Sequence, residues 1–135
     1  MTFLDPGRFG SHVWDDSLTI CIPHTYAVQG PLQVASGATG YLPHFFMPVP
    51  PAQTCALVGV RGMIRTPSDS VTVEIQQNGS AITGMTGISL TSSPSTTYLT
   101  NFVDVFDNDH FCVVVTAIGT APDGLSLTFY FNYQL

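Results

Sequence analysis

Apolar and polar residues alternate along the C-terminal part of the chain, and this alternation predicts a β-strand. Between Leu125 and Leu135 every odd-numbered residue is apolar or aromatic, and every even-numbered residue except Tyr130 is polar. A period of two places alternate side chains on opposite faces of a strand. We therefore expect Phe129 and Phe131 to face a core and Tyr130 to point away from it.

A second alternating segment leads into a hairpin turn. Residues 71–76 alternate between β-branched and polar side chains, and Asn78-Gly79 follows directly. An Asn-Gly pair is favoured in type I′ turns because both central residues of that turn adopt positive φ. The sequence therefore predicts a strand, a two-residue turn and a return strand that starts over residues 80–82.

Two further segments are apolar at both odd and even positions, over residues 55–64 and 111–118. Strands of this kind are covered on both faces, so we expect these two to be central strands. Turn-forming residues cluster at 66–70, 91–95, 107–109 and 120–124, and no segment has the apolar period of a helix. The expected fold is all-β: a single antiparallel two-sheet β-sandwich, jelly-roll-like in its connections.

The first 24 residues differ from the rest of the chain because glycine and proline interrupt them and aromatic residues are scattered among polar ones. We predict an extended N-terminal arm over residues 1–24 and a β-sandwich domain over residues 25–135. Ordering an extended segment costs about 1–2 kcal/mol of backbone entropy per residue, so its apolar side chains must be buried against something. The arm either docks on a partner or folds back over its own sheet edge. The predicted interface residues are Phe3, Leu4, Phe9, Val13 and Trp14, together with Tyr130.

The charge of the chain excludes several classes of partner. Its 135 residues are enough for one domain, and they include three arginines, no lysine and nine acidic residues, a formal net charge of −6. Three cationic groups cannot supply the phosphate contacts that nucleic acids or anionic membranes require. Only 9% of residues are charged, against about 25% in ordinary soluble domains. We therefore expect a homo-oligomer that hides part of this neutral surface.

No motif in the chain predicts catalysis or a cofactor. Nucleophile elbows, phosphate-binding glycine loops and catalytic cysteine signatures are all missing from the sequence, so we predict no enzyme activity, no catalytic residue and no cofactor. The three cysteines have neither disulfide-framework nor zinc-site spacing, and we expect each to be a small buried hydrophobe. His24 and His44, which lie next to prolines, are expected to be solvated or singly hydrogen-bonded. The cysteines are Cys21, Cys55 and Cys112, and the other histidines are His12 and His110.

One local cluster of carboxylates has two interpretations. Asp104, Asp107 and Asp109 could offer oxygen ligands to a cation such as Ca²⁺. The same residues could instead cap backbone N–H groups of a turn. We favour the turn and predict no metal, because the spacing of an EF-hand and its closing glutamate are missing.

The order of these segments resembles small β-sandwich virion proteins of tailed bacteriophages, especially those of actinobacteria. The resemblance covers residues 26–135 and depends on hydrophobic pattern and turns; its main segments are 30–37, 57–66, 70–82, 107–109 and 124–129. It departs from the family at Asn108-Asp109-His110, where a Gly-Asp pair is usual, and residues 1–24 match nothing in that group.

The resemblance implies a non-enzymatic structural component of a virion, most simply a head decoration or head-surface accessory protein. Such a protein would dock as an oligomer, for which a trimer is the first expectation, on the major capsid or tail proteins of the particle. Residues 1–10 contain no basic and apolar leader, so we expect synthesis in the host cytoplasm and final localisation in the virion.

A carbohydrate-binding or tail-tip (minor tail) module that contacts host surface glycans is the alternative function. β-Sandwiches often carry lectin sites, and sugar rings stack on exposed aromatic side chains. Such side chains also anchor protein interfaces, so both functions remain open from the sequence. The available aromatic residues are Trp14, Tyr26, Tyr41, Tyr98 and Tyr130.

Overall fold

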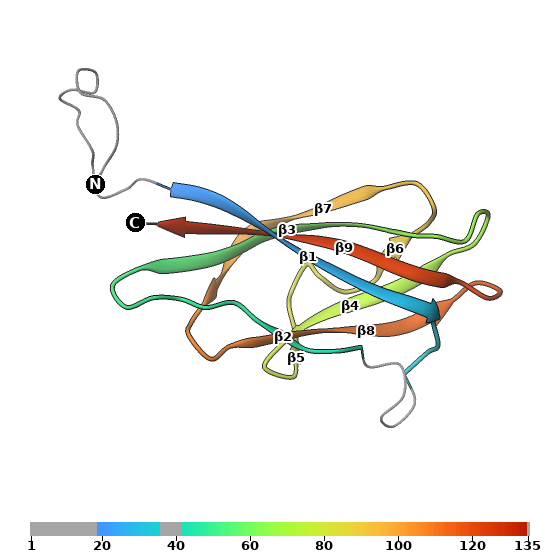
Figure 1. The fold of residues 1–135 in the computed structure, drawn as a ribbon, viewed down its shortest axis with the longest axis horizontal. Coiled ribbons are helices and arrows are strands. Elements are labelled where there is room, and N and C mark those ends of the chain that lie inside the picture. The colour runs from blue at the N-terminus through green and yellow to red at the C-terminus, as the bar shows by residue number, and fades with distance from the viewer. Residues whose placement is uncertain (1–18, 36–41, 135) are drawn as a thin grey trace, which may run out of the picture.

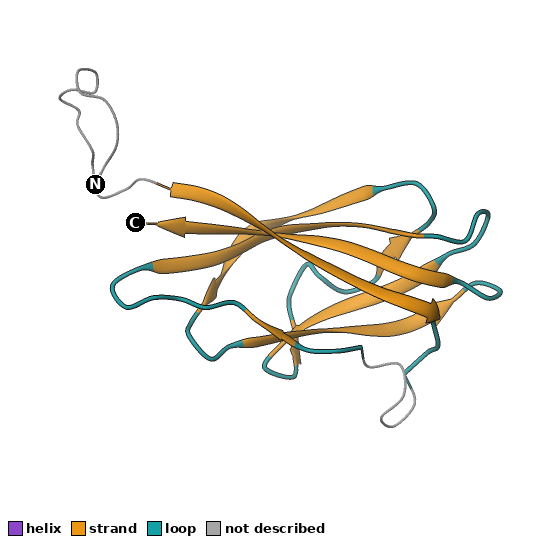
Figure 2. Cartoon of the chain, in the orientation of Figure 1, coloured by secondary structure: helices purple, strands orange, loops and turns teal. Residues whose placement is uncertain are grey.

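The computed structural model describes residues 19–35 and 42–134, and these residues contain strands and loops without any helix (Figure 2). The predicted interface residues Phe3, Leu4, Phe9, Val13 and Trp14 lie outside the described residues. The strands are β1 (Thr19–Pro31), β2 (Phe45–Phe46), β3 (Thr54–Ile64), β4 (Val71–Gln77), β5 (Ser80–Ala81), β6 (Ile88–Leu90), β7 (Ser95–Val105), β8 (His110–Ile118) and β9 (Asp123–Gln134).

The strands form two antiparallel sheets that pack face to face (Figure 1). The first sheet has the order β1-β9-β3-β7. The second has the order β2-β8-β4, with the short strands β5 and β6 both paired to the remaining side of β4. The predicted all-β, antiparallel, two-sheet β-sandwich is therefore confirmed.

Strand β9 has the predicted parity. From Leu125 to Tyr133 its odd-numbered side chains are buried and face the second sheet, while Tyr130 points to the opposite face and is half-buried. Phe129 and Phe131 are fully buried. The Phe129 ring lies edge-on to Phe45 of β2 at 4.8 Å between centroids, and Phe131 contacts Phe111 of β8 at 5.6 Å. These aromatic contacts join the two sheets at the centre of the core.

Both segments that were predicted to be central strands are central. β3 lies between β9 and β7, and β8 lies between β2 and β4. Cover on both faces is confirmed for residues 111–115 of β8, which are all buried, but not for residues 116–118, which are exposed. It is wrong for β3, because Ala56 is half-buried and Arg61 is exposed on the face away from the core. No second layer is seen over that face of β3 in the described residues.

The predicted hairpin is present between β4 and β5. Gln77 pairs with Ser80, and the two residues between them, Asn78 and Gly79, have φ values of 54° and 84°. Two central residues with positive φ make this a type I′ turn, as the Asn-Gly pair predicts. Here the local sequence alone determines the register of the return strand.

One carboxylate fastens two loops at the end of the sandwich where β4 starts. Asp69, in the β3–β4 loop, accepts backbone hydrogen bonds of 2.8–2.9 Å from the N–H groups of Ser70, Thr120 and Ala121. These bonds, with that from Ala121 the strongest, lower the pKa of the carboxyl. A side chain at Gly119 would collide with the Asp69 carboxylate, so glycine is required there.

The predicted boundary at residue 24 is wrong, because β1 starts at Thr19 and residues 19–24 belong to the sandwich. These six residues pair with β9 from Gln134 to Phe129. Pro23 is compatible with a strand because β1 lies at the edge of its sheet. At an edge the proline nitrogen, which carries no hydrogen, can face away from the neighbouring strand. Any segment that precedes the sandwich therefore ends by residue 18.

Candidate functional site

The outer face of the first sheet, meaning the face away from the core, carries a row of aromatic residues. Gly59 of β3 pairs with Tyr130 on β9 and with Tyr98 on β7. The two tyrosines thus flank a glycine across three neighbouring strands. Tyr98 is 69% exposed, and its ring lies so close to Gly59 that a Cβ there would be 2.9 Å from the ring edge.

A shallow groove continues along β3 from this row. The small side chain of Ala56 leaves the middle strand low here, whereas β7 and β9 carry larger side chains on either side. Register places Ala56 between Asp104 and Asn132. The groove has a volume of about 310 Å³, and its lining residues are Thr19, Thr54, Cys55, Ala56, Phe102, Asp104, Asn132 and Gln134. We call it the β3 groove.

Polar groups at the β3 groove have unused hydrogen-bonding capacity. Within the described ranges, the carboxylate of Asp104 and the side-chain amides of Asn132 and Gln134 make no hydrogen bond, and neither do the hydroxyls of Tyr98 and Tyr130. The Gln77 amide does bond to Asp104, but only to its backbone carbonyl. The groove therefore presents aromatic rings together with free donors and acceptors, which is the usual composition of a binding site.

A second surface of interest surrounds the end of the sandwich where β1 starts. Register puts Ile20 of β1, Tyr133 of β9, Cys55 of β3 and Val105 of β7 in one row across this end. Four large apolar side chains are exposed around it, two on β1, one on β2 and one in the β7–β8 turn. They are Ile20 (41% exposed), Ile22 (39%), Phe46 (63%) and Phe106 (66%), and we call them the apolar end.

The loop before β3 lies at the same end. The Tyr133 hydroxyl donates a hydrogen bond of 2.5 Å to the Pro48 carbonyl, which fixes this loop beside the start of β1. Between the loop and the end of β7 is a second concavity of about 310 Å³, to which Val49, Pro50, Pro51 and Phe106 contribute. Much of the surface at this end is therefore apolar, and it is well suited to bury against another protein.

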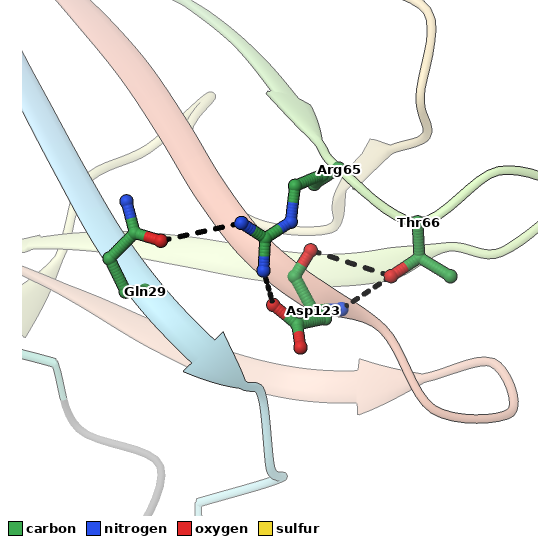
Figure 3. Close-up of polar contacts among 4 residues, drawn as sticks. All are labelled: Gln29, Arg65, Thr66 and Asp123. Atoms are coloured by element: carbon green, nitrogen blue, oxygen red, sulfur yellow. Dashed lines mark hydrogen bonds and ion pairs between the residues drawn. The ribbon is translucent and has the colours of Figure 1, made fainter.

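The opposite end of the first sheet is closed by a polar cluster (Figure 3). Arg65 follows β3 and forms an ion pair of 2.6 Å with Asp123 at the start of β9, and it also donates to the side chain of Gln29 on β1 at 3.4 Å. Thr66 accepts the backbone N–H of Asp123 at 2.8 Å. Arg65 and Asp123 neutralise each other, and the cluster holds three strand ends together.

The carboxylate cluster of β7 and the β7–β8 turn acts as the predicted turn. Asp109 accepts hydrogen bonds from Gln77, Asn78 and the N–H of Phe106 at 2.8–2.9 Å. Burial alone would raise the pKa of this carboxyl, but the hydrogen bonds outweigh it and lower the pKa. In the described part of the chain no three metal-ligating side chains come together. Asp109 is thus committed to the turn, and only Asp104 keeps a free carboxylate at the groove.

The cysteines are distributed differently from the prediction. Cys55 and Cys112 are buried, as expected, and burial raises the pKa of both thiols. Cys21 is exposed, so the prediction of burial is wrong for it. It pairs with Asn132 on the outer face of β1, an edge strand, where nothing in the described residues covers it. Buried thiols with raised pKa values stay protonated and are poor nucleophiles.

The histidines of the described region contact other rings. His24 stacks on Phe45 at 4.3 Å, and burial lowers the pKa of its imidazole. His44 stacks on His110 at 5.1 Å with an angle of 11° between the planes. Neither arrangement pairs an imidazole with a serine hydroxyl or a thiol. These contacts therefore contribute packing and do not form a pair of nucleophile and base.

The sequence identified part of the two surfaces. Tyr98 and Tyr130 lie on the outer face, as sugar stacking requires, and Tyr41 and Trp14 lie outside the described residues. Tyr26 does not fit that function because it is buried and donates its hydroxyl to the Pro43 carbonyl at 2.7 Å. The sequence pattern did not identify Phe102 of the groove, although Phe102 follows Tyr98 on the same strand at an even spacing.

Comparison with known proteins adds no family. No protein-family model matches the chain, and no curated protein is significantly similar to it. Within residues 19–35 and 42–134 we find no helix able to cross a membrane.

Proposed function

We propose that the protein is a non-enzymatic structural component of a bacteriophage virion, a head decoration or head-surface accessory protein that docks as an oligomer on the particle. The apolar end carries this proposal. Its four exposed side chains are large and hydrophobic, and an isolated protein with only 9% charged residues has few means of keeping such a surface solvated. Burial of each would contribute about 1.5–3 kcal/mol.

The order of the strands supports the same class of protein. The short strands β5 and β6 occupy one position beside β4, so they can be counted as a single strand. Numbered in this way, the sheets have the orders 1-8-3-6 and 2-7-4-5, the connections expected of a jelly roll. Jelly rolls are common in viral capsid proteins and also in lectins, so the fold supports the proposal by analogy only.

The position of the apolar end also supports docking. Strand β1 starts there, so residues 1–18 join the domain at the same end as the exposed side chains. An arm that contributes Phe3, Leu4, Phe9, Val13 and Trp14 to an interface would therefore act beside Ile20 and Ile22. This one surface would serve two kinds of contact. One is homo-oligomerisation, with a trimer as the first expectation, and the other is attachment to a capsid or tail protein.

The direct experiment is a mass-spectrometric inventory and a cryo-EM map of particles from the phage that encodes the chain. We expect the protein in hundreds of copies on the head. A handful of copies would indicate the tail tip instead, and complete absence from purified particles would refute a virion role.

A solution experiment tests the apolar end itself. Light scattering should give an oligomer for the full chain, and replacing Phe106 and Ile22 with serine should dissociate it. Ile118→Ser is the matched control, because Ile118 is 37% exposed at the other end of the sandwich. A wild-type monomer that also fails to join particles, or equal dissociation by the control, would contradict the proposal.

A further inference from the structure

The β3 groove combines a narrow floor with aromatic and polar walls. Its wall strands β7 and β9 both pair with β3, so they lie two strand spacings apart, about 10 Å. Side chains on the wall strands narrow this space further. A trough of that width admits a ligand about one sugar ring wide, but it excludes a helix, which is about 10–12 Å across with its side chains.

We propose that the β3 groove binds a neutral glycan. Pyranose rings have an apolar C–H face that stacks on aromatic rings, and a rim of hydroxyls that donate and accept hydrogen bonds. Tyr98 and Phe102 are exposed by 69% and 55%, and Tyr130 lies across Gly59 from Tyr98. Phe102 lines the groove itself, and the two tyrosines supply further stacking surfaces in the adjoining row around Gly59.

The free polar groups match the rim of such a sugar. Asp104 and Asn132 lie in the same row on opposite walls, with the small Ala56 between them. A carboxylate accepts two hydroxyl hydrogen bonds, and an amide both donates and accepts. Because the Asp104 carboxylate and the Asn132 amide make no hydrogen bond within the described residues, neither must break an internal contact to bind a ligand.

Charge argues for a neutral ligand. Arg61 is exposed farther along the same face of β3 but does not line the groove. Among the described residues that do, Asp104 is the only charged one, and the whole chain has a net charge of −6. Both would repel a phosphorylated or carboxylated sugar. The backbone of β3 is already paired on both sides, so an extended peptide could not bind here by strand addition. A glycan, recognised by side chains alone, is the occupant that fits.

The groove and the concavity beside the apolar end share Thr54, Cys55 and Asp104, but the four side chains that define the apolar end do not line the groove. This inference can therefore hold or fail separately from the proposed function. It is tested with the full chain on an array of neutral gluco-, galacto-, manno- and arabino-oligosaccharides, with sialylated and phosphorylated sugars on the same array. Calorimetry then measures the affinity for the strongest neutral hit. We expect saturable binding of neutral sugars and none of the anionic ones.

Substitutions locate the site. Tyr98→Ala and Tyr130→Ala should each weaken the affinity by about tenfold or more, as expected for an aromatic anchor, while Tyr98→Phe keeps most of it. Asp104→Asn should weaken binding without changing the thermal melt. Ile118→Ala, at the far end of the second sheet, is the control and should bind normally.

Three results would overturn the proposal. The first is the absence of binding to any neutral sugar at millimolar concentration, or a preference for anionic sugars. The second is affinity that Tyr98→Ala and Tyr130→Ala leave unchanged although both variants fold. The third is dissociation of a wild-type oligomer by Tyr98→Ala, which would show that a second copy of the chain covers this face.

Discussion

Replacing Phe129 with alanine removes a side chain that makes three aromatic contacts in the core. The ring is fully buried and lies near three others: Phe45 at 4.8 Å, and Tyr26 and Phe131 both at 6.3 Å. These neighbours belong to β1, β2 and β9, so the space left by the ring cannot close by the movement of one strand. We therefore expect a cavity to remain in the variant.

The size of the effect follows from these contacts. Truncating a buried phenylalanine to alanine costs about 3–5 kcal/mol, including the cavity term. Unfolding of a domain of 135 residues has an entropy near 0.28 kcal/mol/K, from about 2.1 cal/mol/K per residue. The melting temperature of Phe129→Ala should thus fall by about 10–18 °C. Total stabilities are only about 5–15 kcal/mol, so part of the variant will be unfolded under mild denaturing conditions.

Thermal melting followed by circular dichroism measures this shift, with Thr128→Ala as the matched control. Thr128 is the preceding residue of β9, but its side chain is half-buried on the outer face. Its loss should change stability by less than about 0.5 kcal/mol. If Thr128→Ala melted far below Phe129→Ala, the strand would be in the opposite register, and the assignment of faces on which both proposed surfaces depend would fail.

Three other predictions concern groups at the surface. The pKa of Asp69 is depressed below its ordinary 3.8. The stabilising effect of its carboxylate is therefore complete above pH 3.8 and is lost as the pH falls through the lower pKa of the folded state. When unfolding is measured as a function of acid pH, Asp69→Asn should lose less stability than the wild type. A thiol reagent should label Cys21 alone in the native protein and also Cys55 and Cys112 after denaturation, and labelling of all three in the native state would contradict their burial. Arg65→Ala should cost no more than about 1 kcal/mol in chemical denaturation, because its ion pair is largely exposed, and a larger loss would show that the cluster in Figure 3 is stronger than an ordinary surface pair.

The sequence was sufficient where a local pattern decides the structure. The alternation of β9 and the type I′ turn at Asn78-Gly79 each follow from side-chain period or turn chemistry within a few residues. The central positions of β3 and β8 were also predicted, although the cover on both faces from which the position of β3 was inferred is wrong. Strand β1 was partly missed because Pro23 and the irregular composition around it hide a strand whose partner, β9, is about a hundred residues away. Edge position makes that proline acceptable, and edge position is a property of the whole sheet.

The two surfaces were harder to predict for the same reason. Tyr130 could be assigned to the outer face from parity alone. Its relation to Tyr98 depends on both residues pairing with Gly59, which no local pattern contains. Likewise, Ile20 and Phe106 are far apart in the sequence, and only the row across β1, β9, β3 and β7 brings their strand ends together. Pairing between distant strands therefore creates both candidate surfaces.

The order β1-β9-β3-β7 also constrains how the chain can fold as it is synthesised. β9 emerges from the ribosome after all the other described strands, yet it lies between β1 and β3 and pairs with both (Figure 1). Until it arrives, β1 has no neighbour in its sheet and the edge of β3 remains open, so the nascent chain cannot complete the first layer. Non-local pairing of this kind folds slowly and leaves unpaired edges exposed in the meantime. The strands of this neutral, lysine-free chain would suit the finished protein for assembly. Until β9 pairs with β1 and β3, however, the exposed edges of those strands can pair with another chain instead.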